Sequence, residues 1–338
     1  MKEKDFWENK KVFVTGSTGF IGRWLVNELL SKGAKVFALV RNSADQTLRN
    51  KGLEKGMLEL IIGRVEDLDI LETAIRSNKI EIIFHLAAKN INIGSALSPL
   101  STFETNLRGS YNLLEAVRRQ SKQISGIILA SSKEAEIFRG KGAKSRDKRH
   151  PYEVSKTCVE LIANAYADTF GLNIAIVKSE NVYGGRDLNW NRLIPGTIRF
   201  ISKGERPVIR SGGDIQRDYV YIKDVIKAYL QLGELISIET LENKIFYLGT
   251  EKNTSTFEIV KKICRLMNVN TGDFEVRNHG FDERKQTIQS TEKTKRLLHW
   301  SPKFDIDTGL KETIEWYDMY FSKKLKVLEN SKSKLFVD

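Results

Sequence analysis

The chain is poor in cysteine, histidine and proline, and it has no long apolar run. Two cysteines and four histidines in 338 residues leave little material for a disulfide framework or a metal site. Cys158 and Cys264 stand outside any CxxC or Cys/His spacing, so we expect two reduced thiols and no metal. No apolar run approaches the roughly 20 residues that span a bilayer, and residues 1–10 lack the apolar stretch of a secretory signal. We therefore expect a cytoplasmic protein without a membrane partner.

Acidic residues are outnumbered by basic ones. The 55 Lys and Arg against 43 Asp and Glu give a net charge of +12. This excess indicates an anionic partner such as nucleic acid, a membrane surface or a phosphorylated small molecule. Much of it lies in residues 139–150 and 322–338, where we expect it to tune solubility or to steer a substrate. The composition is otherwise that of a globular protein, which excludes a disordered or collagen-like chain.

Apolar strands alternate with amphipathic helices over the first half of the chain. The predicted strands are residues 11–15, 35–40, 58–62, 82–86, 126–130 and 174–178, and the predicted helices are 21–32, 68–77, 102–119 and 152–170. Strands separated by helices of this length predict an α/β fold with a doubly wound parallel sheet of the Rossmann type. Beyond residue 178 the rhythm breaks into Gly- and Pro-containing loops, with predicted helices at 225–235, 256–267 and 308–320 and a strand at 244–248.

This change of rhythm predicts two domains. Residues 1–178 are expected to form a dinucleotide-binding domain, to which a strand and a helix near residues 217–250 contribute. Residues 179–321 are expected to form mainly a smaller mixed substrate-binding domain. Residues 322–338 are expected to be a polar tail that frays.

A glycine triplet joins the first strand to the first helix, where residues 15–22 read TGSTGFIG. The first glycine permits a tight turn, the second lets the backbone approach a pyrophosphate, and the third lets the helix pack closely on the sheet. A glycine-rich turn without a ligand is the alternative, but the place in the first βαβ unit favours a dinucleotide site. The predicted cofactor contacts are Gly16, Thr18, Gly19, Phe20, Ile21 and Gly22.

The second predicted strand ends without a carboxylate. An NAD site usually carries an Asp or Glu there for the adenosine ribose, whereas this chain has Val40 followed by Arg41. A guanidinium accommodates a 2′-phosphate. We therefore expect NADP as the cofactor, with NAD as the alternative if Arg41 is only a solvated loop charge.

Tyr152 and Lys156 lie four residues apart at the start of a predicted helix, so they share one helical face. A phenol has a pKa of about 10 and is a poor base, but a neighbouring ammonium stabilises the phenolate and lowers that pKa. The phenolate can then take a proton from a sugar hydroxyl while a hydride leaves the same carbon.

Position distinguishes this pair from two others with the same spacing. Those two are Tyr219/Lys223 and Tyr320/Lys324. Only Tyr152 opens a helix after the fifth parallel strand, whose end carries Ser131-Ser132. Because ligands bind at the carboxyl edge of such sheets, we expect a hydroxyl, a phenol and an ammonium to meet there.

These motifs resemble the extended short-chain dehydrogenase/reductase superfamily over about residues 11–317. The resemblance is carried by TGSTGFIG, by HLAA at 85–88, by Ser131-Ser132 and by YEVSK at 152–156. NVYGG at 181–185, RLIP at 192–195 and RDY at 217–219 resemble the substrate-side motifs of its nucleotide-sugar epimerases and dehydratases. Residues 184–195 and 207–211 most resemble CDP-glucose 4,6-dehydratase-like proteins. Val40-Arg41 resembles GDP-mannose 4,6-dehydratases, which use NADP.

The resemblance implies roles for individual residues. Ser132 would orient the C4 hydroxyl of the sugar, Tyr152 would be the base for its oxidation, and Lys156 would bind the nicotinamide ribose. His85 would line the cofactor or merely end its strand as a satisfied residue, and Asn106 would lie near the site or be an exposed polar residue. The implied cofactor-lining residues further include Leu86, Ala87 and Ala88, and the implied substrate-binding residues are Asn181, Arg192, Arg217 and Arg284. Relatives commonly dimerise through the helices predicted at 102–119 and 152–170.

The two residues after Ser132 distinguish the reactions of this group. Dehydratases carry an acid/base pair there, which removes the C5 proton and protonates the departing C6 hydroxyl. Here the pair is Lys133-Glu134, and Glu134 falls where dTDP-glucose and GDP-mannose dehydratases have their catalytic Glu. Lys133 replaces their Asp or Ser, Glu136-Ile137 replaces a common Tyr-Gly pair, and Gly63-Arg64-Val65 replaces a segment in which relatives usually place Asp beside the adenine.

We therefore interpret the chain as an NAD(P)-dependent nucleotide-sugar 4,6-dehydratase, with Glu134 as the C5 base and Lys133 or a water as the C6 acid. The alternative is an epimerase, reductase or decarboxylase of the same superfamily. A remote alternative is a non-catalytic protein that binds RNA or a dinucleotide, supported only by the basic segment 139–150. The expected partners are a nucleotide-diphosphate sugar and a second copy of the chain.

Overall fold

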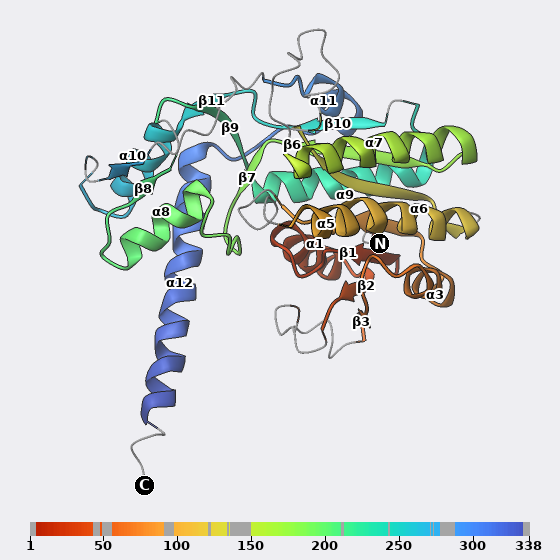
Figure 1. Cartoon of the computed structure of the whole chain (residues 1–338), viewed down its shortest axis with the longest axis horizontal. Coiled ribbons are helices and arrows are strands. Elements are labelled where there is room, and N and C mark those ends of the chain that lie inside the picture. Colours follow the sequence, from red (N-terminus) through yellow and green to blue (C-terminus); the bar gives the residue numbers. More distant parts are fainter. Residues whose placement is uncertain are drawn as a thin grey trace. The chain divides into compact units, whose positions relative to one another are not determined.

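The computed structural model divides the chain into two compact units, each described separately below (Figure 1). The first unit comprises Met1–Glu180, Val225–Leu248 and Thr291–Trp300, and the second comprises Asn181–Asp224, Gly249–Ser290 and Ser301–Asp338. The structure describes residues 5–42, 48, 56–90, 98–120, 123–133, 135, 150–210, 213–242, 244–270, 272, 274–277 and 288–333. Within these ranges, no helix combines the length and the apolar character needed to cross a membrane.

In the described residues, the first unit contains a sheet of seven parallel strands. The strands lie in the spatial order β10 (Ile245–Leu248), β6 (Ile174–Ser179), β5 (Gly126–Ser132), β4 (Ile82–His85), β1 (Lys11–Thr15), β2 (Lys35–Val40) and β3 (Leu58–Ile62). The predicted α/β fold is thereby confirmed. Two strands run further than the sequence indicated, and β5 therefore includes Ser132, which was expected just beyond its end.

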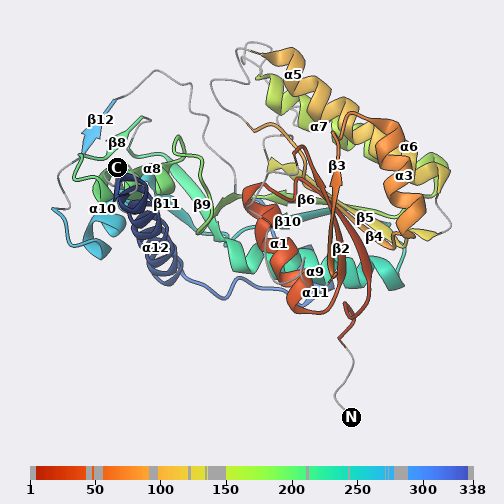
Figure 2. The ribbon, with the colours of Figure 1, turned by 90° about the horizontal axis from the view of Figure 1, so that it is seen from below.

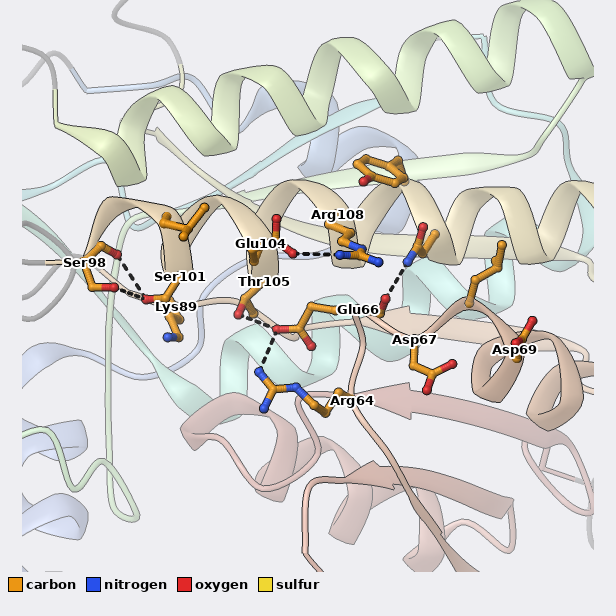
Figure 3. A pocket seen from close by; sticks show the side chains of 14 residues that line it. Arg64, Glu66, Asp67, Asp69, Lys89, Ser98, Ser101, Glu104, Thr105 and Arg108 are labelled. Atoms are coloured by element: carbon orange, nitrogen blue, oxygen red, sulfur yellow. Dashed lines mark hydrogen bonds and ion pairs between the residues drawn. The ribbon is translucent and has the colours of Figure 1, made fainter.

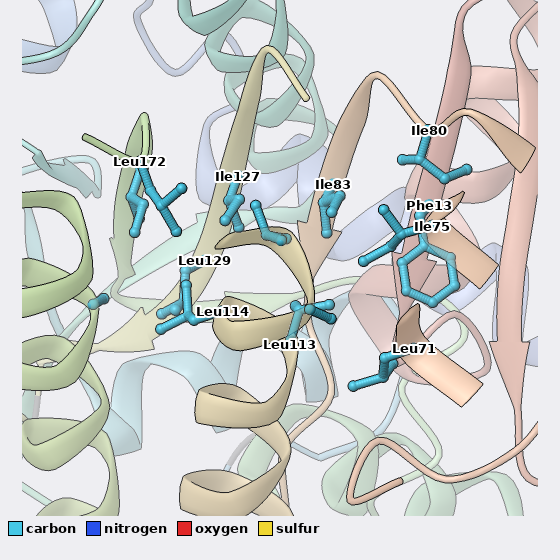
Figure 4. Packing of buried hydrophobic residues seen from close by; sticks show 14 of the residues in the cluster. Phe13, Leu71, Ile75, Ile80, Ile83, Leu113, Leu114, Ile127, Leu129 and Leu172 are labelled. Carbon is cyan, nitrogen blue, oxygen red and sulfur yellow. The ribbon is translucent and has the colours of Figure 1, made fainter. Parts of the chain in front are cut away.

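Helices cover both faces of this sheet (Figure 2). One face carries α3 (Leu68–Asn78), α6 (Gly109–Arg119) and α7 (Pro151–Phe170), and the other carries α1 (Phe20–Ser31) and α9 (Ile222–Ile238), with α11 (Glu292–Leu298) beside β10. On the α3/α6/α7 face, alternate strand residues such as Phe13, Ile83 and Ile127 pack against Leu113 and Leu71 in one buried apolar cluster (Figure 4). Because successive strand side chains point to opposite faces, each face of the sheet is buried by its own layer of helices.

The predicted helix 102–119 is divided into three segments. These are α5 (Pro99–Phe103), a π-helical turn η2 (Glu104–Arg108) and α6. The wide turn places Asn106 inside the unit, where its side chain accepts a hydrogen bond from the Lys89 amide at 2.7 Å and donates to Ser155 Oγ at 2.9 Å. A side chain at Gly109 would meet Val65 at 2.5 Å, so this glycine permits the close approach that follows the turn.

The second unit contains a three-stranded sheet in the order β11 (Asn253–Ser255), β9 (Gln216–Tyr221) and β7 (Asn181–Tyr183). β7 is parallel to β9, and β11 is antiparallel to it. A shorter pair joins β8 (Val208–Ile209) to β12 (Glu275–Val276), and the helices are α8 (Leu193–Ser202), α10 (Thr256–Leu266) and α12 (Ile306–Ser333).

The expectation of a frayed tail from residue 322 is wrong for residues 322–333. Helix α12 continues to Ser333 instead of ending near Tyr320. Its sequence contains neither Pro nor Gly after Gly309, and Lys, Leu and Glu all favour helix, so nothing in the local chemistry ends it at Tyr320. Residues 334–338 lie outside the described part of the chain.

A buried ion pair ties β5, α7 and β6 together. Glu160 accepts a hydrogen bond from Ser131 Oγ at 2.5 Å, and its second carboxylate oxygen lies 3.0 Å from Lys178 Nζ. Both charged side chains are fully buried. Removing one charge of such a pair leaves the other in a low-dielectric interior, which costs more free energy than the intact pair contributes.

Glu160→Gln is therefore expected to lower the free energy of unfolding by about 3 kcal/mol. Urea unfolding followed by circular dichroism measures the change. The double variant Glu160→Gln/Lys178→Met serves as the control, because it removes the stranded ammonium and should recover much of the lost stability. A single variant as stable as the wild type would contradict this account of the pair.

Candidate active site

The loop from β1 to α1 is held by contacts that only glycine allows. Gly16 has a φ of +70°, and a Cβ there would lie 2.6 Å from the Ala87 nitrogen. A Cβ at Gly22 would lie 2.1 Å from the Gly16 carbonyl oxygen. Helix α1 begins after Gly19 with no side-chain cap, so its first N–H groups point outward without a side-chain acceptor. Such a terminus suits a phosphate, and the loop fits a dinucleotide.

The other predicted cofactor contacts lie on this loop and on the first turn of α1, and residues 16–22 are called the cradle below. Thr18 is in the turn, and Phe20 and Ile21 are the first two residues of the helix. The Ser17 hydroxyl, which is buried, donates to the Leu39 carbonyl at 2.9 Å. This bond ties the cradle to β2, one residue before the strand's last residue.

His85 connects the cradle to the neighbouring strand end through hydroxyl groups. Thr15 Oγ1 lies 2.8 Å from His85 Nδ1 and accepts a bond from the Ala87 amide at 3.3 Å. His85 Nε2 lies 2.9 Å from Ser110 Oγ, which itself donates to the Asn106 carbonyl. Since Ser110 gives its own proton away, it accepts from Nε2–H, and Nδ1 accepts from Thr15.

This arrangement holds His85 neutral. Burial, together with the nearby Lys156 charge, lowers the pKa of His85 to about 3. His85 is therefore a satisfied strand-end residue whose hydroxyl partners fix the backbone at Ala87. Of the two interpretations that the sequence left open, the structure supports this one, with Leu86 and Ala88 lying on the same segment after β4.

Helix α7 begins so as to bring Tyr152 and Lys156 to the carboxyl edge of the sheet. His150 caps the helix by accepting from the Tyr152 amide at 3.2 Å, and Glu153 accepts from the His150 amide at 3.3 Å. Tyr152 therefore lies in the first turn, and Lys156 lies one turn later. Lys156 Nζ donates to the Ala130 carbonyl at 2.8 Å, two residues before Ser132 on the same strand. Ser132, Tyr152 and Lys156 are all largely buried at this edge.

The pKa of Lys156 lies well below the usual value of a lysine. Burial lowers its pKa to about 8, and Glu160, one turn further along α7, partly opposes that shift. Glu160 was not predicted from the sequence as a functional residue. Its spacing of four residues from Lys156 on an apolar helical face was the signal that could have found it.

A second acid/base pair lies beside this group. Lys133, directly after β5, forms a short ion pair with Glu180, directly after β6, and both side chains are about nine-tenths buried. β5 and β6 are adjacent parallel strands in which Ser132 pairs with Ser179. Glu180 was not predicted from the sequence as a functional residue, although a carboxylate directly after a parallel strand is a signal for one. The predicted base Glu134 lies outside the described residues.

The predicted substrate residues lie in the second unit. The Asn181 side chain donates to the Asp218 carbonyl at 3.0 Å, and Arg217 precedes Asp218 on the central strand β9. Arg192 is paired with Asp187 at 3.0 Å just before α8. Arg284 lies outside the described residues. Of the two other Tyr/Lys pairs, Tyr219/Lys223 does not share one helical face, because Tyr219 lies on strand β9.

The first unit also contains a pocket of about 820 Å³ between the β3–α3 loop and the helices α5 to α6 (Figure 3). At Lys89 it borders residues 86–88, which are predicted to line the cofactor and are called the cofactor segment below. Ser132, Tyr152 and Lys156 are not among the residues that line it. Its lining is mixed in charge, with Arg64 and Glu66 at 3.5 Å and Arg108 and Glu104 at 3.1 Å.

The chain is similar to a known protein family, to curated proteins and to solved structures. A model of the NAD dependent epimerase/dehydratase family matches residues 12–242. The CDP-glucose 4,6-dehydratase of Salmonella typhimurium is 28% identical, with 94% of this chain and 93% of that protein covered. The UDP-glucuronate 4-epimerase of Thermodesulfobacterium geofontis is 29% identical, with 90% and 94% covered. The crystal structure of UDP-glucose 4-epimerase with UDP-glucose from Thermotoga maritima is 25% identical, with a TM-score of 0.80 and 92% and 99% covered.

The lowered pKa of Lys156 predicts a pH dependence of stability. Below about pH 8 the folded protein holds a buried ammonium at a cost in free energy, whereas the unfolded chain keeps its proton up to about 10.5. Between these values the unfolded state binds more protons, so rising pH stabilises the folded state by up to about 1.4 kcal/mol per pH unit.

We therefore expect the unfolding free energy of wild type to rise relative to that of Lys156→Met as the pH increases from 8 to 10.5. Urea unfolding of the two proteins at several pH values measures the difference, in which the titration of other groups cancels. Parallel curves across this range would show that the Lys156 pKa is not lowered.

Proposed function

The chain belongs to the NAD dependent epimerase/dehydratase family, and on that premise we propose that it is a nucleotide-sugar 4,6-dehydratase. It oxidises C4 of an NDP-hexose, eliminates water across C5 and C6, and returns the hydride to C6. The observation that carries the proposal is the acid/base sequence at the end of β5. There Lys133 and Glu134 directly follow Ser132, and Lys133 is held by the carboxylate of Glu180.

The first step is proton removal from the C4 hydroxyl. Ser132 hydrogen-bonds that hydroxyl, and the phenolate of Tyr152 takes its proton. The Lys156 ammonium stabilises the phenolate and binds the nicotinamide ribose, and its burial strengthens both interactions because the local dielectric is low. The bound cofactor supplies the hydride acceptor for C4 and the hydride that is returned at the end.

The second step removes water from the 4-keto sugar. The ketone acidifies the C5 proton, and Glu134 is the proposed base that takes it; this transfer requires a base within about 3 Å of the proton. Lys133 then protonates the departing C6 hydroxyl. Glu180 holds the Lys133 ammonium in place for this step through their ion pair.

NADP is the proposed cofactor. Arg41 is exposed directly after β2, and Val40 stands where an NAD site carries a carboxylate. A guanidinium at this place suits a 2′-phosphate. The first unit is accordingly assigned to the dinucleotide.

The second unit is assigned to the nucleotide-diphosphate part of the substrate. The proposed binding residues are Asn181, Arg192, Arg217 and Arg284. The guanidinium groups suit a diphosphate because they donate bidentate hydrogen bonds to phosphate oxygens.

We propose that two copies of the chain form a homodimer through the outer surface of the first unit. Leu100 on α5, Tyr111 on α6 and Leu161 on α7 are exposed apolar side chains. α7 packs against both α5 and α6. Apolar side chains on such neighbouring helices suit contact with the same surface of a second copy.

A nucleotide-sugar epimerase is the second candidate. Its support is the departure of Lys133, Glu136 and Ile137 from the dehydratase pattern, together with the 29% identity to a UDP-glucuronate 4-epimerase. A decarboxylase of the family would use the same C4 oxidation, whereas a reductase would consume reduced cofactor. The step after C4 oxidation therefore distinguishes the candidates.

Tyr152→Phe is expected to slow reduction of the bound cofactor by a nucleotide sugar by about 10²–10⁴-fold, because the variant has no group to take the C4 proton. Stopped-flow absorbance of the reduced nicotinamide measures this rate. Tyr320→Phe is the control, since that tyrosine has the same Tyr/Lys spacing and lies on α12. Equal rates in wild type and Tyr152→Phe would refute the assignment.

Glu134→Gln is expected to separate the two steps. Cofactor reduction should survive, because C4 oxidation does not use Glu134, while formation of the 6-deoxy product should fall by about 10²–10⁴-fold. Product is measured by mass spectrometry, and Glu136→Gln, which removes the same charge two residues away, is the control. Product formed at the wild-type rate in Glu134→Gln would exclude Glu134 as the C5 base.

A further inference from the structure

A second arginine stands at the same edge of the sheet as Arg41. β2 and β3 are adjacent parallel strands in which Val40 pairs with Ile62, and the Gly63 amide donates to the Val40 carbonyl at 2.9 Å. Arg41 and Arg64 therefore begin the loops that leave two neighbouring strands at the carboxyl edge. Neighbouring strands lie roughly 4.8 Å apart, so the two guanidinium groups start from adjacent points of the backbone.

Packing fixes the backbone from which Arg64 extends. A Cβ at Gly63 would lie 2.7 Å from the Ile70 side chain, and Val65 is buried. Between these two anchored residues the Arg64 side chain is 70% exposed. The loop thus presents a guanidinium to solvent from a well-defined position.

The neighbouring carboxylates are engaged elsewhere. Glu66 accepts a hydrogen bond from Thr105 Oγ1 at 2.8 Å and lies at the limit of hydrogen-bond contact with Arg64, at 3.5 Å (Figure 3). Asp67 caps α3 by accepting from the Ile70 amide at 3.2 Å. An exposed ion pair of this length contributes little free energy, so Arg64 keeps donors for an anion.

We propose that Arg64 is a second cation for the 2′-phosphate of NADP and that it sets cofactor preference together with Arg41. The Ser17–Leu39 bond places the pyrophosphate cradle against the end of β2, where the adenosine ribose of a dinucleotide lies. A 2′-phosphate there carries about −1.5 to −2 charges near pH 7, which two guanidinium groups neutralise better than one. The inference rests on the NADP preference proposed above.

The test compares the dissociation constants of NADP and NAD, by calorimetry, for wild type, Arg64→Ala and Arg64→Asp. Loss of a charge-assisted hydrogen bond should weaken NADP binding about tenfold in Arg64→Ala and leave NAD binding within about twofold. Arg64→Asp should weaken NADP binding further, because a carboxylate repels the phosphate. The effect should shrink as salt is added.

Arg76→Ala is the matched control, since Arg76 is an exposed arginine in the last turn of α3, away from the β3–α3 loop that carries Arg64. It should leave the ratio of the two constants unchanged. An Arg64→Ala variant that changes both affinities equally, or neither, overturns the inference. A wild type that prefers NAD contradicts the proposed cofactor preference instead, and the change in the ratio still decides the role of Arg64.

Discussion

The burial of the Lys156 ammonium is the constraint on which the rest of the site depends. A charge inside the protein is tolerated only where hydrogen bonds and opposite charges compensate for lost water. Here the Ala130 carbonyl accepts from Lys156, and Glu160 lies one turn away on α7. The carboxyl end of β5 and the first turns of α7 must therefore meet at one point. Ser132 and Tyr152 reach the same edge because they belong to those two segments.

The cofactor segment is positioned by close packing and by hydroxyl groups. Gly16 and Gly22 allow backbone contacts that any side chain would prevent. Neutral His85 fixes the backbone at Ala87 through Thr15. Both features hold backbone in place without adding charge near Lys156. The buried ion pair of Lys133 and Glu180 lies at the same edge of the sheet.

Much of this fold could be predicted because its signals are local. Apolar strands alternating with helices predicted the sheet, and the glycine triplet predicted the cradle that Gly16 and Gly22 form. The π-helical turn at Glu104–Arg108 could not be predicted, because it depends on the contact of Asn106 with Lys89 and Ser155, far apart in the sequence. The Lys133–Glu180 pair was missed for the same reason, since 46 residues separate the partners and only strand pairing joins them. The polar composition of residues 322–333 predicted a tail, whereas their Lys, Leu and Glu residues favour the helix that α12 forms.

The most direct test of the central claim is the mass of the product that the wild-type enzyme forms from a panel of nucleotide sugars in heavy water. A dehydratase removes the C5 proton to a protein group and replaces it from solvent. The product should therefore be lighter than its substrate by one water and, after return to ordinary water, retain a single solvent deuterium at C5. A product isobaric with its substrate and free of solvent deuterium would contradict the account and identify an epimerase.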